Sequence, residues 1–362
     1  MDVDTMKRFC AVIFEDTPQT KDCLISNLKS GIADEDFMTA YYGKPSEGEP
    51  GINFDEAPSF FAIDEALRSK GVTFVVFLDW ELSKFLPALS RHEIEGLCNE
   101  LGVAVCIYHY AHGEAEQIRK MKRWDETRIV LEDVSTSERL ARNVKSCTLG
   151  FLEIWREFSK PDRQELSSTI NRILRTPQGS EISVDQYLWS RFRPLQVAEM
   201  PSEAMSQQVI TALGYWIYNV LLQFPGALLN EVAAASYLDI LTEDFSREEV
   251  KRFFDRALYN GPFHETGPFW WAKRLDEILE ERMDQDDKEF ISGRTFLERQ
   301  HVAVGRARCY RGHEGAGYYC IILQQPVCAE HSEYPSGWLP LGADRSRIEK
   351  AKFSELMPWI GL

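Results

Sequence analysis

The chain of 362 residues lacks the features that mark membrane and exported proteins. Its most apolar long stretch, residues 209–222, is shorter than a bilayer span and is flanked by glutamines, so we expect a buried helix there. Residues 1–9 lack the basic and apolar regions of a signal peptide. The eight cysteines are scattered without a disulfide-like framework. We therefore expect a cytoplasmic protein with reduced thiols and no membrane partner.

The sequence also lacks an excess of basic residues and the common catalytic motifs. It has 41 Lys and Arg against 57 Asp and Glu, a net charge of −16, which disfavours binding to nucleic acid. Residues 117–123 (QIRKMKR) are the best candidate for a basic patch, but such a run is typical of a solvated helix face. No GxxxxGK[ST], GxSxG or HExxH motif is present, so a kinase or ATPase is not expected. A non-enzymatic role is favoured, and an enzyme of another kind stays open.

Two apolar segments that end in acidic residues are the most informative features that the chain does have. Residues 72–79 (VTFVVFLD) end on Asp79, and an apolar segment near the N-terminus runs into Glu15 and Asp16. Buried strands of this kind are typical of parallel sheets, in which ligands bind beyond the carboxyl ends of the strands. Three carboxylates at that edge suit a hard cation with oxygen ligands.

Strand-like and helix-like patterns alternate over residues 1–158 and predict an α/β fold with a doubly wound, five-stranded parallel sheet. The expected strands lie at about 8–14, 37–42, 72–79, 103–108 and 128–131, and the expected helices at about 18–30, 60–70, 90–101, 113–124 and 137–158. Residues 43–58 are rich in glycine, proline and acids and are expected to form a loop or insertion.

A change of pattern near residue 160 marks the expected end of this first domain. Residues 162–290 predict a helical domain, with helices at about 162–175, 184–198, 203–224, 227–240, 246–258 and 268–284. Residues 291–362 predict a small β-rich element that is closed by a short helix near 346–357. The chain is therefore expected to have three parts.

Residues 1–158 resemble the receiver domain of two-component phosphorelays. Glu15 and Asp16 look like the acidic pair that holds Mg²⁺ in that family, and Asp79 looks like its phosphoacceptor. The resemblance implies that a histidine kinase, or another protein of such a pathway, transfers a phosphoryl group to the Asp79 carboxylate. It implies a phosphorylated signalling protein of the response-regulator type, and it says nothing about the residues after 160.

The chain departs from the receiver pattern at two places. Tyr108, followed by His109, stands at the end of the fourth expected strand, where the family usually has Ser or Thr. Glu132 and Asp133 follow the fifth strand in place of the family's Lys, which removes a cation and adds repulsion against an anion. A receiver without that lysine fits a phosphoryl sink, which accepts phosphoryl groups without signalling onward. Receiver proteins with unfamiliar C-terminal parts occur in bacterial anti-phage two-component systems, where such a sink is expected.

Other residues near the same edge are open alternatives. Lys145 or Arg142 could replace the missing lysine only if the fold returns them to the site. His109 and His112 could act as acid–base groups or as phosphoryl carriers. Histidines at a strand end are more often ordinary polar residues, and we prefer that interpretation.

A second group of chemically active residues lies near the C-terminus. Cys309, His313, Cys328 and His331 carry thiol and imidazole groups of the kind that bind Zn²⁺. The sequence gives zinc less weight than magnesium, because no Cys-x-x-Cys motif is present and Cys320 lies in an apolar, strand-like segment. A Cys328 nucleophile paired with His331 or His313 is a weaker alternative.

Three functions follow from these patterns, in order of preference. The first is an atypical receiver that accepts a phosphoryl group on Asp79. The second is a pseudo-receiver scaffold in which the acids are structural and the region of Trp270 and Trp271 binds a partner, although aromatic residues more often fill a core. The third is a metal-dependent enzyme that uses the C-terminal cysteine–histidine cluster. The partner kinase and the oligomeric state stay open.

Overall fold

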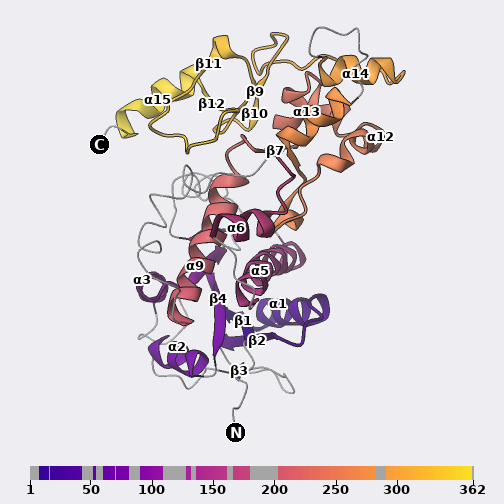
Figure 1. The fold of residues 1–362 in the computed structure, drawn as a ribbon. Coiled ribbons are helices and arrows are strands. Elements are labelled where there is room, and N and C mark those ends of the chain that lie inside the picture. The colour runs from indigo at the N-terminus through magenta and orange to yellow at the C-terminus, as the bar shows by residue number, and fades with distance from the viewer. Residues whose placement is uncertain are drawn as a thin grey trace. The chain divides into compact units, whose positions relative to one another are not determined.

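The computed structural model describes residues 8–15, 17–42, 52–53, 60–69, 71–80, 90–108, 128–131, 136–160, 166–179, 203–281 and 291–360 (Figure 1). The chain forms two compact units. The first consists of Met1–Ile173, Trp189–Asn219 and Gly261–Thr266, and the second consists of Leu174–Leu188, Val220–Asn260 and Gly267–Leu362. This division differs from the three expected parts, because a helix after residue 203 belongs with the α/β unit.

The first unit is built on a six-stranded parallel sheet with the order β3-β2-β1-β4-β5-β6. Its strands are β1 (Arg8–Phe14), β2 (Phe37–Tyr42), β3 (Ile52–Asn53), β4 (Val72–Asp79), β5 (Ala104–Tyr108) and β6 (Ile129–Val130). The predicted parallel α/β sheet is confirmed, and the five predicted strands are β1, β2, β4, β5 and β6. The prediction of a loop over residues 43–58 needs a correction, because the short strand β3 within it pairs with β2.

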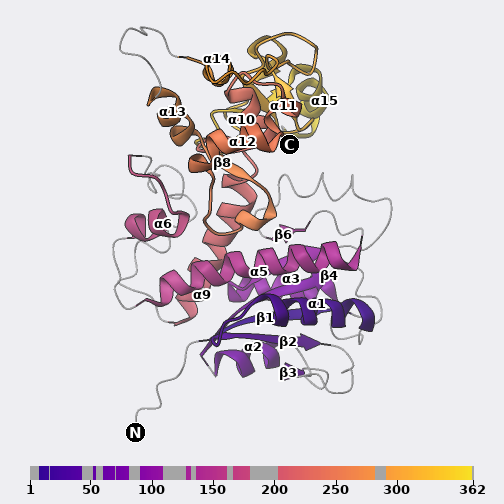
Figure 2. The same cartoon turned by 90° about the vertical axis from the view of Figure 1, so that its right-hand side faces the viewer.

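Helices cover both faces of this sheet. The described helices up to residue 216 are α1 (Pro18–Gly31), α2 (Phe60–Arg68), α3 (Arg91–Leu101), α5 (Ser137–Ser159), α6 (Leu166–Leu174) and α9 (Glu203–Trp216). α1 and α5 lie side by side on one face, and α2 and α3 lie on the other (Figure 1, Figure 2). The predicted doubly wound arrangement is therefore present. The predicted helices at 113–124 and 184–198 lie outside the described residues.

Local sequence explains where these helices begin and end. α3 starts at a capping box, in which Ser90 and Glu93 each accept a hydrogen bond from the other's backbone N–H. It ends at Gly102, whose φ of 67° is in the left-handed region that favours glycine. α5 starts at Thr136, whose hydroxyl accepts a hydrogen bond from the N–H of Arg139. These caps fix the helix ends that connect to the strands.

A side chain of α9 forms hydrogen bonds with the backbone near the start of the central strand β4. The ladder between β4 and β5 begins with Val75 opposite Ala104, one residue after Phe74. The amide of Gln207 binds both backbone groups of Phe74: its Nε2 donates to the carbonyl at 3.0 Å, and its Oε1 accepts from the N–H at 3.0 Å. Gln207 is buried. Its amide satisfies the backbone groups of Phe74, which precedes the first residue of β4 that pairs with β5.

The same side of α9 binds backbone at intervals of four residues, which lie on one face of a helix. Thr211 donates to a carbonyl of the turn before β5 at 2.8 Å, and the hydroxyl of Tyr215 accepts from the N–H of Val105 at 2.7 Å. Asn219, in the π-helical turn that follows, donates to the carbonyl of Arg128 at 2.8 Å. This polar stripe is buried against the sheet, and it joins α9 to the first unit.

The second unit combines short helices with two small sheets. Its helices are α10 (Glu231–Tyr237), α11 (Thr242–Phe245), α12 (Glu248–Lys251), the 3₁₀ helices η3 (Arg252–Ala257) and η5 (Ala329–His331), α13 (Ala272–Glu280), α14 (Gly293–Arg299) and α15 (Lys350–Ile360). The sheets are an antiparallel pair, β7 (Leu228–Asn230) with β8 (Phe269–Trp271), and the order β10-β9-β12-β11, formed by Gln325–Val327, Tyr318–Cys320, Ser346–Glu349 and Ser332–Glu333. The predicted small β element near the C-terminus is confirmed.

Three predicted helices of this unit need correction. β7 and β8 occupy the first residues of the helices expected at 227–240 and 268–284, so α10 and α13 start later. The 3₁₀ helix η3 replaces the second half of the helix expected at 246–258. Trp270 is 1% exposed and meets the ring of Phe245 edge-on at 5.1 Å. This burial agrees with the expectation that the aromatic side chains fill a core.

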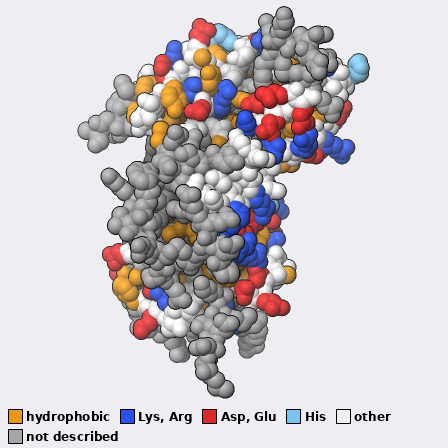
Figure 3. Space-filling view, in the orientation of Figure 1, with side chains coloured by type: hydrophobic (Ala, Val, Ile, Leu, Met, Phe, Trp, Pro, Cys, Tyr) orange, Lys and Arg blue, Asp and Glu red, His pale blue; other side chains and the backbone are white. Residues whose placement is uncertain are grey.

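The described surface carries charges of both signs. In Figure 3, Asp and Glu side chains are intermingled with Lys and Arg side chains on the second unit. Among the described helices, none is both long and apolar enough to cross a membrane. Residues 209–222 belong to α9 and the helical turn after it, so the predicted buried helix is present.

Candidate functional site

Glu15 and Asp79 lie on neighbouring strands at the carboxyl-terminal edge of the parallel sheet. β1 and β4 pair with Phe14 opposite Leu78, and each acid follows its member of this pair directly. On the other side of β4, Asp79 lies opposite Tyr108 of β5. Both acids are buried, with Glu15 3% and Asp79 8% exposed. Two buried acids therefore lie at the edge where parallel α/β sheets bind their ligands.

Two hydrogen bonds hold the carboxylate of Glu15. The hydroxyl of Tyr108 donates to its Oε2 at 3.1 Å, and the backbone N–H of Thr17 donates to its Oε1 at 2.8 Å. In the sequence Tyr108 was visible only as a departure from the receiver pattern. The structure gives it a positioning role, which the sequence could not indicate because Tyr108 and Glu15 are far apart in the chain.

Two cations lie on the elements that leave this edge, and sequence reasoning missed both. Lys21 of α1 is 1% exposed, and its ammonium group lies 4.9 Å from the ring centre of Tyr41 on β2. Arg91, the first residue of α3, stacks its guanidinium 3.7 Å from the ring centre of Trp80. Trp80 directly follows Asp79 in the chain.

Arg91 belongs to a cluster of three charges. Its Nε lies 2.9 Å from the carboxylate of Glu95, and the Nη1 of Arg128 lies 2.6 Å from the same carboxylate. Burial lowers the pKa of the Arg91 guanidinium, Glu95 raises it, and the second arginine lowers it again. Arginine keeps its charge in proteins, so the carboxylate of Glu95 holds two guanidinium groups, one of which stacks on Trp80.

Other residues expected near this edge are placed elsewhere or not described. Asp16, His109, His112, Glu132 and Asp133 lie outside the described residues. The side chain of Lys145 reaches Gly31, the last residue of α1, where an added Cβ would lie 2.6 Å from the Cε of Lys145. α1 leaves the carboxyl edge and ends at the opposite edge, before β2 begins. Lys145 therefore does not take the place of the receiver lysine.

The second unit brings together three of the four residues predicted as zinc ligands. The Nδ1 atom of His331 lies 3.1 Å from the Sγ atom of Cys328 and 3.7 Å from the Sγ atom of Cys309. The three ligand atoms all lie within 4.8 Å of one another. The ring of His313, the fourth predicted ligand, meets the ring of His331 edge-on, with 4.3 Å between their centres.

The two thiols of this cluster lie in a small core and are not exposed. Burial raises the pKa of the Cys309 thiol, while the backbone N–H groups of Arg311 and Cys328 act in the opposite direction. Cys320, in the same core, has another role. Its Sγ accepts hydrogen bonds from the N–H groups of Leu323 at 3.4 Å and Glu349 at 3.3 Å, so it serves the backbone of the sheet.

Glu349 links the cysteine–histidine cluster to the C-terminal helix. Its carboxylate accepts from the Nη2 of Arg311 at 2.6 Å and from the N–H of Lys352, in the first turn of α15, at 3.0 Å. Burial alone would raise the pKa of Glu349, but Arg311 and the N–H groups of α15 outweigh it, and the pKa lies below its ordinary value.

This pKa predicts a pH-dependent effect of Glu349→Gln. An acid with a lowered folded-state pKa contributes stability above its unfolded-state pKa, and that stability is lost as the pH falls through the folded-state value. We expect Glu349→Gln to lower the free energy of unfolding by about 1 kcal/mol near neutral pH. The difference from the wild type should shrink as the pH falls below the ordinary pKa of a glutamate. Urea unfolding near neutral pH and in acid measures this difference, and a substitution of the exposed Glu333, Glu333→Gln, is the control. A difference that persists unchanged in acid would contradict it.

Comparison of the chain with family models, with curated proteins and with solved structures gives no match. Function must therefore be inferred from the two arrangements of residues, the carboxylate edge of the first unit and the cysteine–histidine cluster of the second.

Proposed function

We propose that the protein is an atypical receiver that accepts a phosphoryl group on Asp79. The observation that carries the proposal is that Asp79 and Glu15, both buried, end neighbouring parallel strands at the ligand-binding edge of the sheet. The topology supports it as well. With the short strand β3 set aside, the order β2-β1-β4-β5-β6 follows the 2-1-3-4-5 order of flavodoxin-like folds, which receivers share.

In the proposed reaction an Oδ atom of Asp79 attacks the phosphorus atom of the donor. The bond between phosphorus and the leaving atom of the donor breaks, and an acyl phosphate forms on the carboxylate. The leaving group departs with the electron pair of the broken bond and takes up a proton. Positioning and charge neutralisation, rather than acid–base chemistry by the protein, are the main requirements of such a transfer.

The residues at this edge fit a divalent cation. Glu15 and Asp79 offer hard oxygen ligands, and a carboxylate oxygen has two lone pairs, so the hydrogen bonds from Thr17 and Tyr108 do not by themselves exclude a metal. Mg²⁺ would be held by these two acids together with Asp16. Bound there, it would neutralise negative charge on the phosphoryl oxygens.

Lys21 and Arg91 are the cations that we propose in place of the family's lysine. One is buried on the helix that follows Glu15, and the other is stacked on the residue that follows Asp79. Neither stands on the strand that carries the lysine in receivers, so neither would couple phosphorylation to the same conformational switch. This supports a phosphoryl sink, loaded by a histidine kinase of a bacterial two-component system, and antiviral defence is the setting that we propose.

Intact mass spectrometry of the full-length protein tests the proposal. After incubation with Mg²⁺ and acetyl phosphate, we expect one phosphoryl group on the wild type and none on Asp79→Asn. Asp36→Asn, which changes a partly exposed acid at the opposite end of the sheet, is the matched control and should keep the adduct. Omission of Mg²⁺ should abolish it.

Two outcomes would contradict the proposed function. One is an adduct of equal yield on Asp79→Asn, which would place the phosphoryl group elsewhere. The other is a wild type that gains no phosphoryl group from acetyl phosphate or phosphoramidate in the presence of Mg²⁺. The second outcome would favour the pseudo-receiver alternative, in which the hydrogen bonds from Tyr108 and Thr17 to Glu15 serve structure alone.

A further inference from the structure

We propose that the second unit contains a structural zinc site formed by Cys309, His313, Cys328 and His331. This inference is independent of the proposed phosphoryl acceptor, because all four ligands belong to the second unit. The site is built from the two cysteine–histidine pairs Cys309–His313 and Cys328–His331, which are separated in the chain by β9 and β10.

The two distances from the Nδ1 atom of His331 to the sulfur atoms are close to those of a tetrahedral site. With Zn–S bonds of roughly 2.3 Å and Zn–N bonds of roughly 2.0 Å, tetrahedral geometry places sulfur and nitrogen ligands about 3.5 Å apart. The separations of 3.1 Å and 3.7 Å from the Nδ1 of His331 to the sulfur atoms of Cys328 and Cys309 lie on either side of that value. Three ligand atoms thus surround a point at which one ion could bind all of them.

His313 is the fourth ligand that we infer. Its ring centre lies 4.3 Å from that of His331, and its side chain is about half exposed, so it can turn toward the ion without repacking a core. The alternative is Glu330, whose Oε2 lies 3.9 Å from the Nδ1 of His313. Two thiolates and two imidazoles form a common structural zinc set, and a carboxylate is a less frequent member of such sites.

The backbone of both pairs is already folded into tight turns. The N–H of Cys309 donates to the carbonyl of His313 at 2.7 Å, and the N–H of Gly312 donates to the carbonyl of Cys309 at 2.7 Å. Gly312 has a φ of 85°, a conformation that favours glycine. In the second pair, the N–H of His331 donates to the carbonyl of Cys328 at 3.2 Å. Each turn brings its histidine back toward its cysteine.

The donor set also distinguishes the ligands from the neighbouring thiol. Cys320 is fully buried, and its sulfur accepts two backbone hydrogen bonds, so it is not assigned to the site. Soft thiolates combined with imidazoles select zinc over magnesium or calcium. Binding releases the protons of the two thiols to solvent, since the thiolates are the ligands.

A zinc ion would stabilise the side of the small sheet that carries the cysteines. The four-stranded sheet is built from strands of two to four residues. The cluster beside the proposed ligands has four buried residues, three of which are cysteines: Cys309, Cys320, Val327 and Cys328. Tyr319 and Ile348 of the same sheet pack instead into the main core of the second unit. A metal bound on the cysteine side would therefore add stability where the apolar contacts are few.

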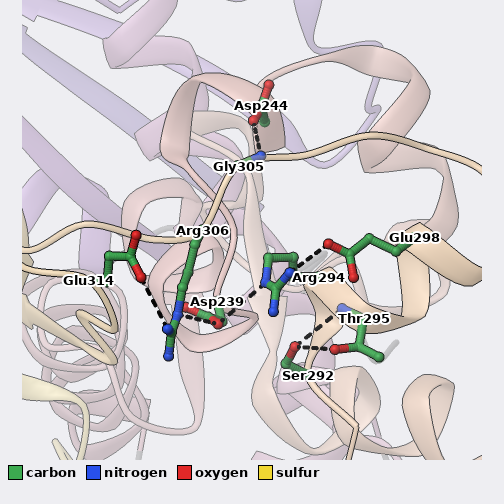
Figure 4. A network of polar contacts seen from close by, with 9 residues as sticks. All are labelled: Asp239, Asp244, Ser292, Arg294, Thr295, Glu298, Gly305, Arg306 and Glu314. Carbon is green, nitrogen blue, oxygen red and sulfur yellow. Dashed lines mark hydrogen bonds and ion pairs between the residues drawn. The ribbon is translucent and has the colours of Figure 1, made fainter.

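A network of polar contacts holds Gly305, Arg306 and Glu314, which flank the first cysteine–histidine pair in the chain (Figure 4). Arg306 binds Asp239 and Glu314, each at 3.2 Å, and the N–H of Gly305 donates to Asp244 at 2.6 Å. These contacts fix the ends of the segment that carries the first pair to Asp239, which follows α10, and to Asp244 of α11. Loss of zinc should therefore loosen the small sheet and leave the helical part of the second unit folded.

Metal analysis of the full-length protein tests the site. After refolding with Zn²⁺ and removal of the excess, we expect one tightly held zinc per chain in the wild type and none in Cys309→Ser or Cys328→Ser. Cys23→Ser, a partly exposed thiol of α1, and Glu330→Gln are the controls and should keep the ion. A wild type that binds no zinc in competition with a weak chelator, or a Cys328→Ser variant that retains it, would overturn the proposal.

The absorption spectrum of the protein with Co²⁺ in place of zinc is a second test, and it can be recorded on the wild type. The wild type should show thiolate-to-cobalt charge-transfer bands and the intense visible bands of a tetrahedral site, and EDTA should abolish both reversibly. His313→Ala should weaken the visible bands, and Glu330→Gln should leave them unchanged. The absence of thiolate bands in the wild type would overturn the site. A change on Glu330→Gln alone would overturn the assignment of His313.

Discussion

Replacement of Gln207 by alanine is expected to lower the free energy of unfolding of the first unit by about 2–4 kcal/mol. The amide of Gln207 is buried and binds both the N–H and the carbonyl of Phe74, so the substitution leaves two buried backbone groups without this partner. Each such group costs about 1–3 kcal/mol. The effect should appear in β4, the strand that carries Asp79.

Hydrogen exchange of a peptide that contains β4, together with the thermal midpoint, measures this effect. Gln208→Ala, at the neighbouring exposed position of the same helix, is the matched control and should change stability by no more than about 0.5 kcal/mol. Equal protection of β4 in Gln207→Ala and the wild type would contradict the assignment of α9 to the sheet. Loss of protection in both variants would indicate an effect on the helix itself.

Replacement of Gly226 by alanine is expected to destabilise the second unit by about 3 kcal/mol, near the upper end of the usual cost of overpacking. A Cβ at this position would lie 1.7 Å from the carbonyl oxygen of Gly342, a backbone atom that cannot rotate away. The same turn is held by Ser346, whose hydroxyl donates to the carbonyl of Pro225 at 3.0 Å. Relief of the clash would have to break this contact between residues 225–226 and the start of β12.

Urea unfolding and hydrogen exchange of the second unit provide the measurement. Gly96→Ala is the control, because an added Cβ there meets no atom within 4 Å and the residue lies in α3. It should raise the stability of the first unit by about 0.5–1 kcal/mol, since alanine favours helix. A Gly226→Ala protein as stable as the wild type would show that the turn is not packed in this way.

The sheet of the first unit could be predicted because its strands are buried on both faces. Such strands are continuous apolar runs, and the acids at their ends stand out in the sequence. That Glu15 and Asp79 lie at the same edge followed from the expected parallel sheet, and the pairing of β1 with β4 came from the structure. The hydrogen bond from Tyr108 to Glu15 could not be predicted, because it depends on the orientation of a side chain two strands away.

The position of α9 was hidden for a different reason. One face of α9 carries a polar stripe formed by Gln207, Thr211 and Tyr215. The sequence pattern of such a stripe is the same whether the stripe faces water or the backbone of a strand. Only the structure shows that the strand ladder starts one residue after Phe74 and that the stripe completes it. The short strands β7 and β8 were hidden too, since three apolar residues do not distinguish a strand from the start of a helix.

The sequence predicted the members of the cysteine–histidine cluster but gave zinc binding there little weight. Its spacing lacks the usual Cys-x-x-Cys pair, and each half contributes one cysteine and one histidine. The hairpin of β9 and β10 returns the second pair to the first, which spacing alone cannot indicate. The geometry of His331 with both sulfur atoms therefore carries more weight than the motif did.

Chemical trapping of the modified residue tests the central claim most directly. Borohydride reduces an aspartyl phosphate to homoserine, so the full-length protein would be treated with Mg²⁺ and acetyl phosphate, reduced, digested and sequenced by mass spectrometry. We expect homoserine at position 79 alone, and none when the phosphodonor or Mg²⁺ is left out. Unmodified aspartate at position 79, with homoserine at another acid or nowhere, would contradict the assignment of Asp79 as the phosphoryl acceptor.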